Sequence, residues 1–352
     1  MRDRMKSIAT AAVLSTTAFI LVAASTTGTL QAREWQAWVG AEGPNPSSQA
    51  LAFLPNELWI HTNDSVRWMI ASTEIHTVTF LTATQPKLPL FSTFLVQNGC
   101  DPATPITPDG SSFDGSACVN SGIMGSFDTI VGPRTYSVKF PAAGNFKLIC
   151  LVHPDMTGAI HVLNPSQTLP YDQDFYNREA QSDATALVSE ATRLTSRAMT
   201  ESNDASPFLK VTAGISEITT TSGAGSQTPT LFLFLRGVIV VRVGDTVEWT
   251  SLDQSDPHTV TFGTEPADPR PPSPPPVVTT DSDGARHAVI SSPGDSANSG
   301  LLVPSSEDRI GIPQAPLGVT RFRVTFKSPG TYNYICALHD NLRMRGTVIV
   351  HE

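Results

Sequence analysis

Basic residues are scarce in this sequence, and beyond the first six residues they form no cluster. The 352 residues include 23 lysines and arginines against 32 aspartates and glutamates, which gives a net charge of −9 at pH 7. Proteins that bind nucleic acid concentrate positive charge on one surface, so we expect no nucleic-acid partner. Charged residues make up 16% of the chain and hydrophobic residues 40%, a balance typical of a folded, soluble protein.

Cysteine is also rare, and none of the four cysteines precedes Cys100, which excludes an N-terminal cysteine modified by lipid. The N-terminus instead resembles a secretory signal, with three basic residues within positions 2–6 and an apolar run over 8–24. We expect residues 1–32 to be a cleaved signal peptide and the protein to be secreted or periplasmic, and so extracytoplasmic. Alternatively, the segment stays uncleaved and anchors the chain in a membrane, since the run is nearly long enough to span one.

Proline and glycine, in contrast, are abundant, with 28 and 24 residues. So many turn-forming residues indicate an all-β chain. Short runs that alternate apolar and polar residues, such as "YSVKF" at 136–140 and "FRVTF" at 322–326, are typical of a β-sandwich.

The sequence also repeats itself, with five landmarks in the same order in each half. A phenylalanine precedes an aspartate by 11 residues, as Phe53 precedes Asp64 and Phe234 precedes Asp245. The other four pairs are "DSVRW" and "DTVEW" at 64–68 and 245–249, "HTVTF" at 76–80 and 258–262, "VNSGIM" and "ANSGLL" at 119–124 and 297–302, and "FPAAGNFKLIC" and "FKSPGTYNYIC" at 140–150 and 326–336. A repeat of this length indicates a domain duplication, and we place the two domains at 34–165 and 205–352.

The segment between the domains, 166–204, has a different pattern. Apolar residues recur in it at steps of three and four, which predicts one amphipathic helix with a narrow, alanine-rich face. We expect this helix to pack on one or both sandwiches; the alternative is a helix that associates with itself. The face consists of Ala180, Ala184, Leu187, Ala191, Leu194 and Ala198.

Each repeat contains residues that together can bind a metal. The histidine that opens "HTVTF" is followed far downstream by a loop that carries a cysteine, a histidine and a methionine. Two imidazoles and a thiolate in one plane, with a weak axial thioether, form a blue-copper electron-transfer site. The candidate ligands are His76, Cys150, His153 and Met156 in the first half, and His258, Cys336, His339 and Met344 in the second.

With these ligands in order, both halves resemble cupredoxins of the plastocyanin and amicyanin kind. The Cys-x2-His-x2-Met spacing of the first loop is similar to the amicyanin loop, and the Cys-x2-His-x4-Met spacing of the second is similar to the plastocyanin loop. The resemblance implies two Greek-key β-sandwiches, one type 1 copper in each, two per chain, and a role as an electron carrier whose redox partner proteins the sequence does not identify.

Other interpretations of these residues remain open. A buried cysteine near a histidine is often structural, and a single methionine often only fills space in the core. Both structural interpretations would, however, have to apply in each of the two repeats, with the residues in the same order. Zinc is a further possibility, but structural zinc rarely uses a thioether. If Cys150 and Cys336 hold metal, only Cys100 and Cys118 remain to form a disulfide, which an oxidising compartment favours.

An enzyme is the main alternative to a carrier, because copper nitrite reductases and two-domain laccases also pair cupredoxin domains. In those enzymes a histidine beside the blue-copper cysteine leads to a catalytic copper held by histidines. Here Ile149 and Ile335 precede the cysteines, and no His-x-His pair occurs in the sequence. We therefore expect no enzymatic activity and no catalytic residues. A copper storage or delivery protein would use the same ligands, so the sequence does not distinguish these two functions clearly from electron transfer.

Overall fold

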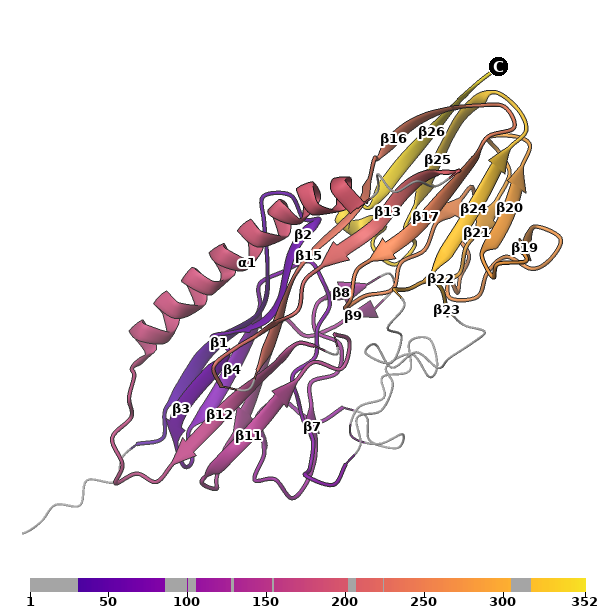
Figure 1. Cartoon of the computed structure of the whole chain (residues 1–352). Coiled ribbons are helices and arrows are strands. Elements are labelled where there is room, and N and C mark those ends of the chain that lie inside the picture. Colours follow the sequence, from indigo (N-terminus) through magenta and orange to yellow (C-terminus); the bar gives the residue numbers. More distant parts are fainter. Residues whose placement is uncertain are drawn as a thin grey trace, which may run out of the picture. The chain divides into compact units, whose positions relative to one another are not determined.

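A computed structural model describes residues 31–85, 100, 106–127, 130–153, 155–201, 207–223, 225–304 and 318–352. The expected signal peptide at 1–32 lies almost wholly outside the described residues, so its cleavage stays a prediction. Residues 32–352 form one compact unit, which Figure 1 shows as strands together with one long helix.

The first half consists of two facing groups of strands. In one group, β1 pairs in parallel with β4 and antiparallel with β2, and β4 pairs antiparallel with β10. In the other, β12 pairs antiparallel with β11 and in parallel with β3. The strands of this half are β1 (Glu34–Glu42), β2 (Ser48–Leu54), β3 (Glu57–His61), β4 (Ser65–Ile70), β5 (Thr79–Phe80), β6 (Ser111–Ser112), β7 (Val119–Asn120), β8 (Ser126–Phe127), β9 (Ile130–Val131), β10 (Thr135–Lys139), β11 (Gly144–Ile149) and β12 (Thr157–Leu163).

The second half repeats this pairing strand for strand. There β13 pairs in parallel with β17 and antiparallel with β15, and β17 pairs antiparallel with β24. Opposite them, β26 pairs antiparallel with β25 and in parallel with β16. The elements are β13 (Leu209–Ser216), β14 (Thr219–Thr220), β15 (Ser226–Leu235), β16 (Val238–Arg242), β17 (Thr246–Leu252), β18 (Thr261–Phe262), β19 (Val278–Thr280), β20 (Arg286–Ile290), β21 (Ala297–Asn298), β22 (Leu301–Leu302), β23 (Gly318–Val319), β24 (Arg321–Phe326), β25 (Gly330–Ile335), the 3-10 turn η2 (Asp340–Leu342) and β26 (Arg345–His351).

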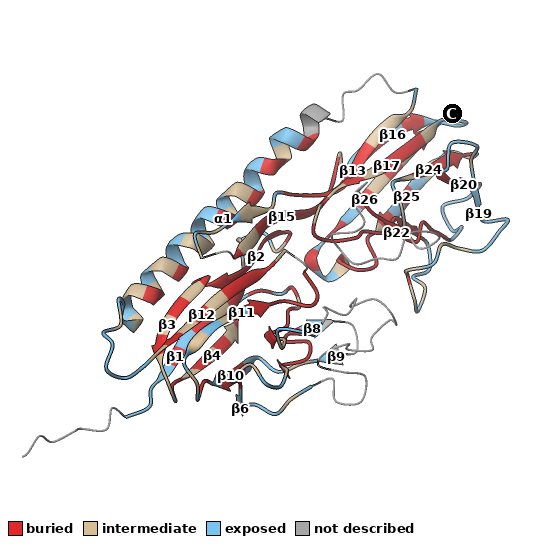
Figure 2. Ribbon diagram, turned by 60° about the horizontal axis from the view of Figure 1, so that its bottom comes forward, coloured by how far each residue is buried: buried red, intermediate tan, exposed pale blue. Residues whose placement is uncertain are grey.

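Each half has its own hydrophobic core between its two groups of strands. Figure 2 shows the buried residues running along these strands. Trp68 on β4 and Trp249 on β17 are fully buried in the two cores, where their large side chains bury much apolar area. The predicted class, an all-β chain with two sandwiches and one helical linker, is confirmed.

The helix α1 (Gln173–Glu201) lies along both halves and uses the predicted apolar face to do so. Ala180 and Leu187 pack with residues of β2, whereas Leu194 and Ala198 pack with residues of β13 and β15. The face that the sequence predicts is therefore the buried one. No described helix contains an apolar stretch long enough to cross a membrane.

The two halves also contact each other directly through their strands. β15 continues the sheet of the first half by pairing antiparallel with β2, with Thr228 opposite Leu51 and Leu231 opposite Ser48. In addition, the Ser47 hydroxyl donates a hydrogen bond to the Leu342 carbonyl, 2.7 Å away. This contact holds the start of β2 against the turn η2, in the loop that carries His339.

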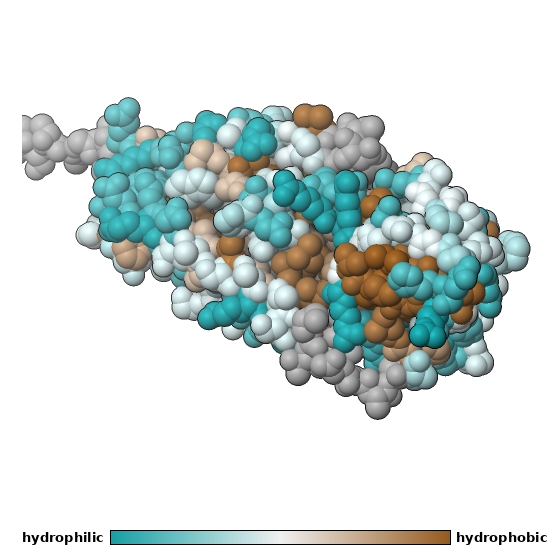
Figure 3. Space-filling view, turned by 90° about the horizontal axis from the view of Figure 1, so that it is seen from above, coloured by the Kyte–Doolittle hydropathy of each residue, from teal (hydrophilic) through white to brown (hydrophobic). Residues whose placement is uncertain are grey.

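Two further features are visible outside the cores. The expected disulfide joins Cys100 to Cys118, while Cys150 and Cys336 are free and buried. The surface in Figure 3 carries an apolar patch toward the end that holds the second half, and Val238 and Val240 of β16 are 66% and 59% exposed.

Candidate metal centres

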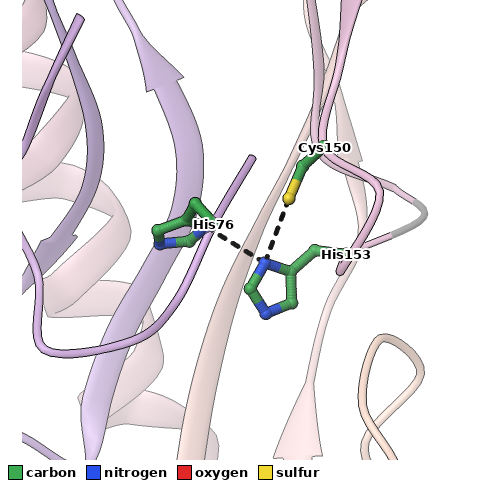
Figure 4. Close-up of side chains that lie close together, drawn as sticks. All are labelled: His76, Cys150 and His153. Carbon is green, nitrogen blue, oxygen red and sulfur yellow. Dashed lines mark hydrogen bonds between the residues drawn. The ribbon is translucent and has the colours of Figure 1, made fainter. Parts of the chain in front are cut away.

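The first centre brings together three side chains from distant parts of the sequence. His76 forms a β-bridge with Met124 ahead of β5, Cys150 follows β11, and His153 lies on the next turn. The two Nδ1 atoms of His76 and His153 are 3.0 Å apart, and the Cys150 Sγ is 3.6 Å from the His153 Nδ1 (Figure 4). All three side chains are completely buried.

The second centre has the same construction. His258 forms a β-bridge with Leu302, and Cys336 and His339 follow β25. The Cys336 Sγ lies 3.8 Å from the His258 Nδ1 and 3.5 Å from the His339 Nδ1, and the two nitrogens are 3.2 Å apart. The folding of the two repeats therefore builds two separate triads of the same atoms.

The donor atoms of each triad fit a bound metal ion. Within each triad the three atoms all lie within 4.8 Å of one another, as donors of one ion must when its bonds are about 2.0–2.3 Å long. A set of one thiolate and two imidazoles suits copper. Copper bound there would be held by His76, Cys150 and His153, and by His258, Cys336 and His339.

Electrostatics favours the thiolate form of both cysteines. Burial by itself raises the pKa of the Cys150 thiol, but the charge of His153 and hydrogen bonds from His153 and His76 outweigh burial and hold that pKa well below its usual value. The same balance, with His339 and His258, lowers the pKa of Cys336. A thiolate is the form that binds metal.

The threonine after each strand histidine contacts the cysteine sulfur. The backbone N–H of Thr77 points at the Cys150 Sγ, and that of Thr259 at the Cys336 Sγ, each over 3.3 Å. Hydrogen bonds to a ligand sulfur tune the properties of a copper site. The repeated "HTVTF" thus supplies a ligand and a hydrogen-bond donor to the neighbouring ligand.

The repeated Asn-Ser-Gly motif holds this segment in place. In the first half the Val78 N–H donates to the Ser121 Oγ at 2.8 Å, and the Thr79 hydroxyl donates to the Asn120 Oδ1 at 2.7 Å. Equivalent bonds in the second half run from Val260 to Ser299 and from Thr261 to Asn298, both over 2.8 Å. Because these groups are buried, the bonds fix the position of the ligand histidine.

A glycine in each half leaves space for the ring of the strand histidine. Gly40 in β1 and Gly214 in β13 have φ values of +68° and +71° at a β-bulge. A Cβ at Gly40 would lie 2.4 Å from the His76 Nε2, and one at Gly214 would lie 2.0 Å from the His258 Nε2. Only glycine fits here, since it tolerates the positive φ and has no side chain.

The second nitrogen of the strand histidine meets different partners in the two halves. The His76 Nε2 is 3.1 Å from the Ser72 hydroxyl, whereas the His258 Nε2 is 3.1 Å from the buried Asp253 carboxylate. A carboxylate partner makes an imidazole ligand more basic than a hydroxyl does. The two centres therefore differ chemically although their ligand sets match.

The loop histidines also differ. The His339 ring stacks flat on Phe232, with 4.3 Å between the ring centres. The His153 Nε2 instead faces the carboxylates of Glu74, at 3.6 Å, and Asp256, at 3.5 Å. Burial and the charges of Asp253 and Glu74 raise the pKa of Asp256 to about 7, although His153 opposes this shift.

The predicted axial ligands lie next to their cysteines in the fold. Met156 and Met344 are fully buried, and their carbonyls accept hydrogen bonds from the Cys150 and Cys336 N–H groups at 2.9 and 3.0 Å. The assignment of both methionine sulfurs as axial ligands stays a prediction.

Sequence reasoning did not identify the glycines, threonines and carboxylates around the ligands. The threonines could have been found, because the identical "HTVTF" preserves them beside the histidine. The carboxylates Glu74, Asp253 and Asp256 carry a weaker signal, since each lies two to five residues before a ligand histidine. The contact of Asp256 with His153 depends on how the halves pack.

Comparison with known proteins gives one family match. Residues 224–351 match the family of copper binding proteins, plastocyanin/azurin family. No curated protein matches the chain. Among solved structures, the oxidised plastocyanin of Dryopteris crassirhizoma is 24% identical, over 40% of this chain and 99% of that one, with a TM-score of 0.21. A reduced Cu(I) form of an amicyanin variant is 18% identical, over 37% and 82%, with a TM-score of 0.23.

The family match includes all four candidate ligands of the second centre, His258, Cys336, His339 and Met344, together with Thr259, whose N–H points at the cysteine sulfur. Residues 224–351, which include the second centre, are therefore similar to the copper binding proteins of the plastocyanin/azurin family.

Proposed function

We propose that this protein is an extracytoplasmic electron carrier with one type 1 copper in each half. The observation that carries the proposal is the pair of buried triads, each built from two Nδ1 atoms and one Sγ atom. Copper bound there would supply one-electron redox chemistry. The partners would be redox proteins of unknown identity that deliver and accept electrons.

The surroundings of the triads support electron transfer because they hold the ligands still. The strand histidines are fixed by β-bridges to Met124 and Leu302. The cysteines are fixed by hydrogen bonds that join the two ends of each loop. Side chains held in this way keep their geometry when the charge at the site changes, and small rearrangement favours fast electron transfer.

Burial favours the carrier over copper storage or delivery. His339 is the most exposed of the eight candidate ligands, and it is only 5% exposed. Delivery requires an acceptor to reach the ligands or the ion, and these side chains offer no such access without movement of the loops. Ile149 and Ile335, which precede the cysteines, favour a carrier over a copper enzyme.

The test of this proposal is the loss of colour on replacing each cysteine. Cys150→Ser and Cys336→Ser should each remove about half of the intense thiolate-to-Cu(II) absorption, and the double variant should remove all of it, because that absorption requires the thiolate. The visible spectrum of each copper-loaded variant gives the result. Loss of the whole absorption in one single variant would rule out two independent centres.

We expect the copper-loaded protein to turn over neither nitrite nor dioxygen with phenolic donors. The reason is that isoleucines stand at 149 and 335, where the copper enzymes place a histidine that leads to a second copper. Steady-state assays with fully loaded protein measure this, with a known copper oxidase as the positive control. Sustained turnover at either substrate would replace the carrier with an enzyme.

A further inference from the structure

The imidazole of His153 differs from the other three candidate histidines because carboxylates of both halves contact it directly. Its Nε2 lies 3.6 Å from the Glu74 Oε1 and 3.5 Å from the Asp256 Oδ1. Glu74 is 6% exposed and Asp256 4% exposed. Among the described residues, the His153 Nε2 has no hydrogen-bond partner at shorter range, so these two carboxylates are the acceptors available to it.

Asp256 reaches this nitrogen from the second half of the chain. It lies two residues before the ligand His258, just as Glu74 lies two residues before the ligand His76. Two equivalent positions of the repeat thus converge on one imidazole. The interface keeps them there, because β15 pairs with β2 and Ser47 bonds to the Leu342 carbonyl.

From this geometry we infer that Asp256 is a positioning residue for the first metal centre, supplied by the second half. A histidine that ligates through Nδ1 carries its proton on Nε2. A carboxylate that accepts this proton fixes the tautomer and the ring orientation, and it raises the basicity of the ligand nitrogen. Asp256 does so for His153 together with Glu74 of the first half, so the first centre has both of its acceptors only when the two halves are in contact.

Among the described residues, no carboxylate of the first half lies in direct contact with a histidine of the second centre, although Ser47 bonds to its loop and the charge of Glu74 raises the pKa of His339. Its loop histidine, His339, packs on Phe232, and the carboxylate that contacts its strand histidine is Asp253 of the same half. Asp256 contacts His153 at 3.5 Å but acts on His339 only through its charge. A change at Asp256 should therefore act mainly on the first centre, although its closest ligand in the sequence, His258, belongs to the second.

This inference rests on the proposed function, because it needs a metal at the first centre. Its test uses two backgrounds in which only one centre is coloured: Cys336→Ser reports on the first centre and Cys150→Ser on the second. Asp256→Ala and Asp256→Asn are made in each. The Cu(II) dissociation constant is measured by chelator competition, the copper hyperfine splitting by electron paramagnetic resonance, and the fold by thermal unfolding of the metal-free protein.

In the Cys336→Ser background, we expect Asp256→Ala to raise the dissociation constant of the first centre by about 10–100-fold, as loss of an outer hydrogen-bond partner typically does, and to change its hyperfine splitting. Asp256→Asn keeps an acceptor oxygen of the same size and should recover part of the affinity. In the Cys150→Ser background, both variants should change the affinity of the second centre much less, because Asp256 has no side-chain contact with its ligands and acts on His339 only through its charge.

Three results would overturn the inference: a weakened second centre with an intact first one, an equal loss at both centres, or no change at either. If Asp256→Ala does not fold, the isosteric Asp256→Asn decides between these results through the hyperfine splitting and affinity of the first centre. A Cys336→Ser protein that binds no copper at all would instead refute the proposed function, and with it the premise of this inference.

Discussion

Gly214→Ala should abolish copper binding at the second centre and leave the first centre intact. The new Cβ would lie 2.0 Å from the Nε2, 2.6 Å from the Cδ2 and 2.8 Å from the Cε1 of His258. The ring cannot give way, because His258 is completely buried and its Nε2 also contacts Asp253. The ligand must therefore move or the bulge must open. The measurement is the visible absorption of copper-loaded protein, which should fall by half.

Gly284→Ala provides a matched control within the same half. Gly284 has a φ of +84°, and a Cβ there meets no atom within 4 Å. Alanine at this turn carries the backbone cost of a left-handed conformation, about 1–2 kcal/mol, without any clash. It should lower the free energy of unfolding by about that amount and keep both centres. Equal colour in the two variants would show that Gly214 does not make room for the ligand.

Copper loading should raise the melting temperature substantially. Without metal, two imidazole nitrogens and a sulfur crowd within each buried centre, with 3.0 Å between the nitrogens of the first. A ligand that binds only the folded state stabilises it by about 4 kcal/mol per site when its free concentration exceeds the dissociation constant about a thousandfold. For a protein of this size, that corresponds to a rise of about 5 °C per site.

Calorimetry of the same preparation before and after chelation measures this effect. Cys150→Ser and Cys336→Ser serve as controls, and each should keep only the shift that comes from its remaining centre. Superimposable unfolding curves with and without copper would mean that the triads do not bind the metal in the folded state.

The ligands could be predicted from the sequence because their spacing is local and repeated. Cys150 and His153 are three residues apart on one turn, and "HTVTF" marks the strand histidine in both copies. The residue types that bind metal therefore stand at the positions that the repeat marks. The helix was predictable for a similar reason, since its apolar face from Ala180 to Ala198 follows the helical period and is the face that packs on the sheets.

The surroundings of the ligands could not be predicted, because they depend on contacts between distant strands. Nothing in the pattern around Gly214 indicates that its missing side chain makes room for His258. The approach of Asp256 to His153 requires the pairing of β15 with β2, and strand pairing between two domains has no periodic signature in a single sequence. The ligand sets of the two centres match in sequence, so the sequence did not show that the partners of their histidines differ.

The most direct test of two copper centres per chain is a titration of metal-free protein with Cu(II), followed by the thiolate-to-copper absorption. Both cysteines are buried with lowered pKa values, because the neighbouring histidines outweigh the effect of burial, so both should bind as thiolates. We predict a linear rise that ends at two equivalents of copper per chain. An end point at one equivalent, or the absence of an intense absorption, would contradict the proposal.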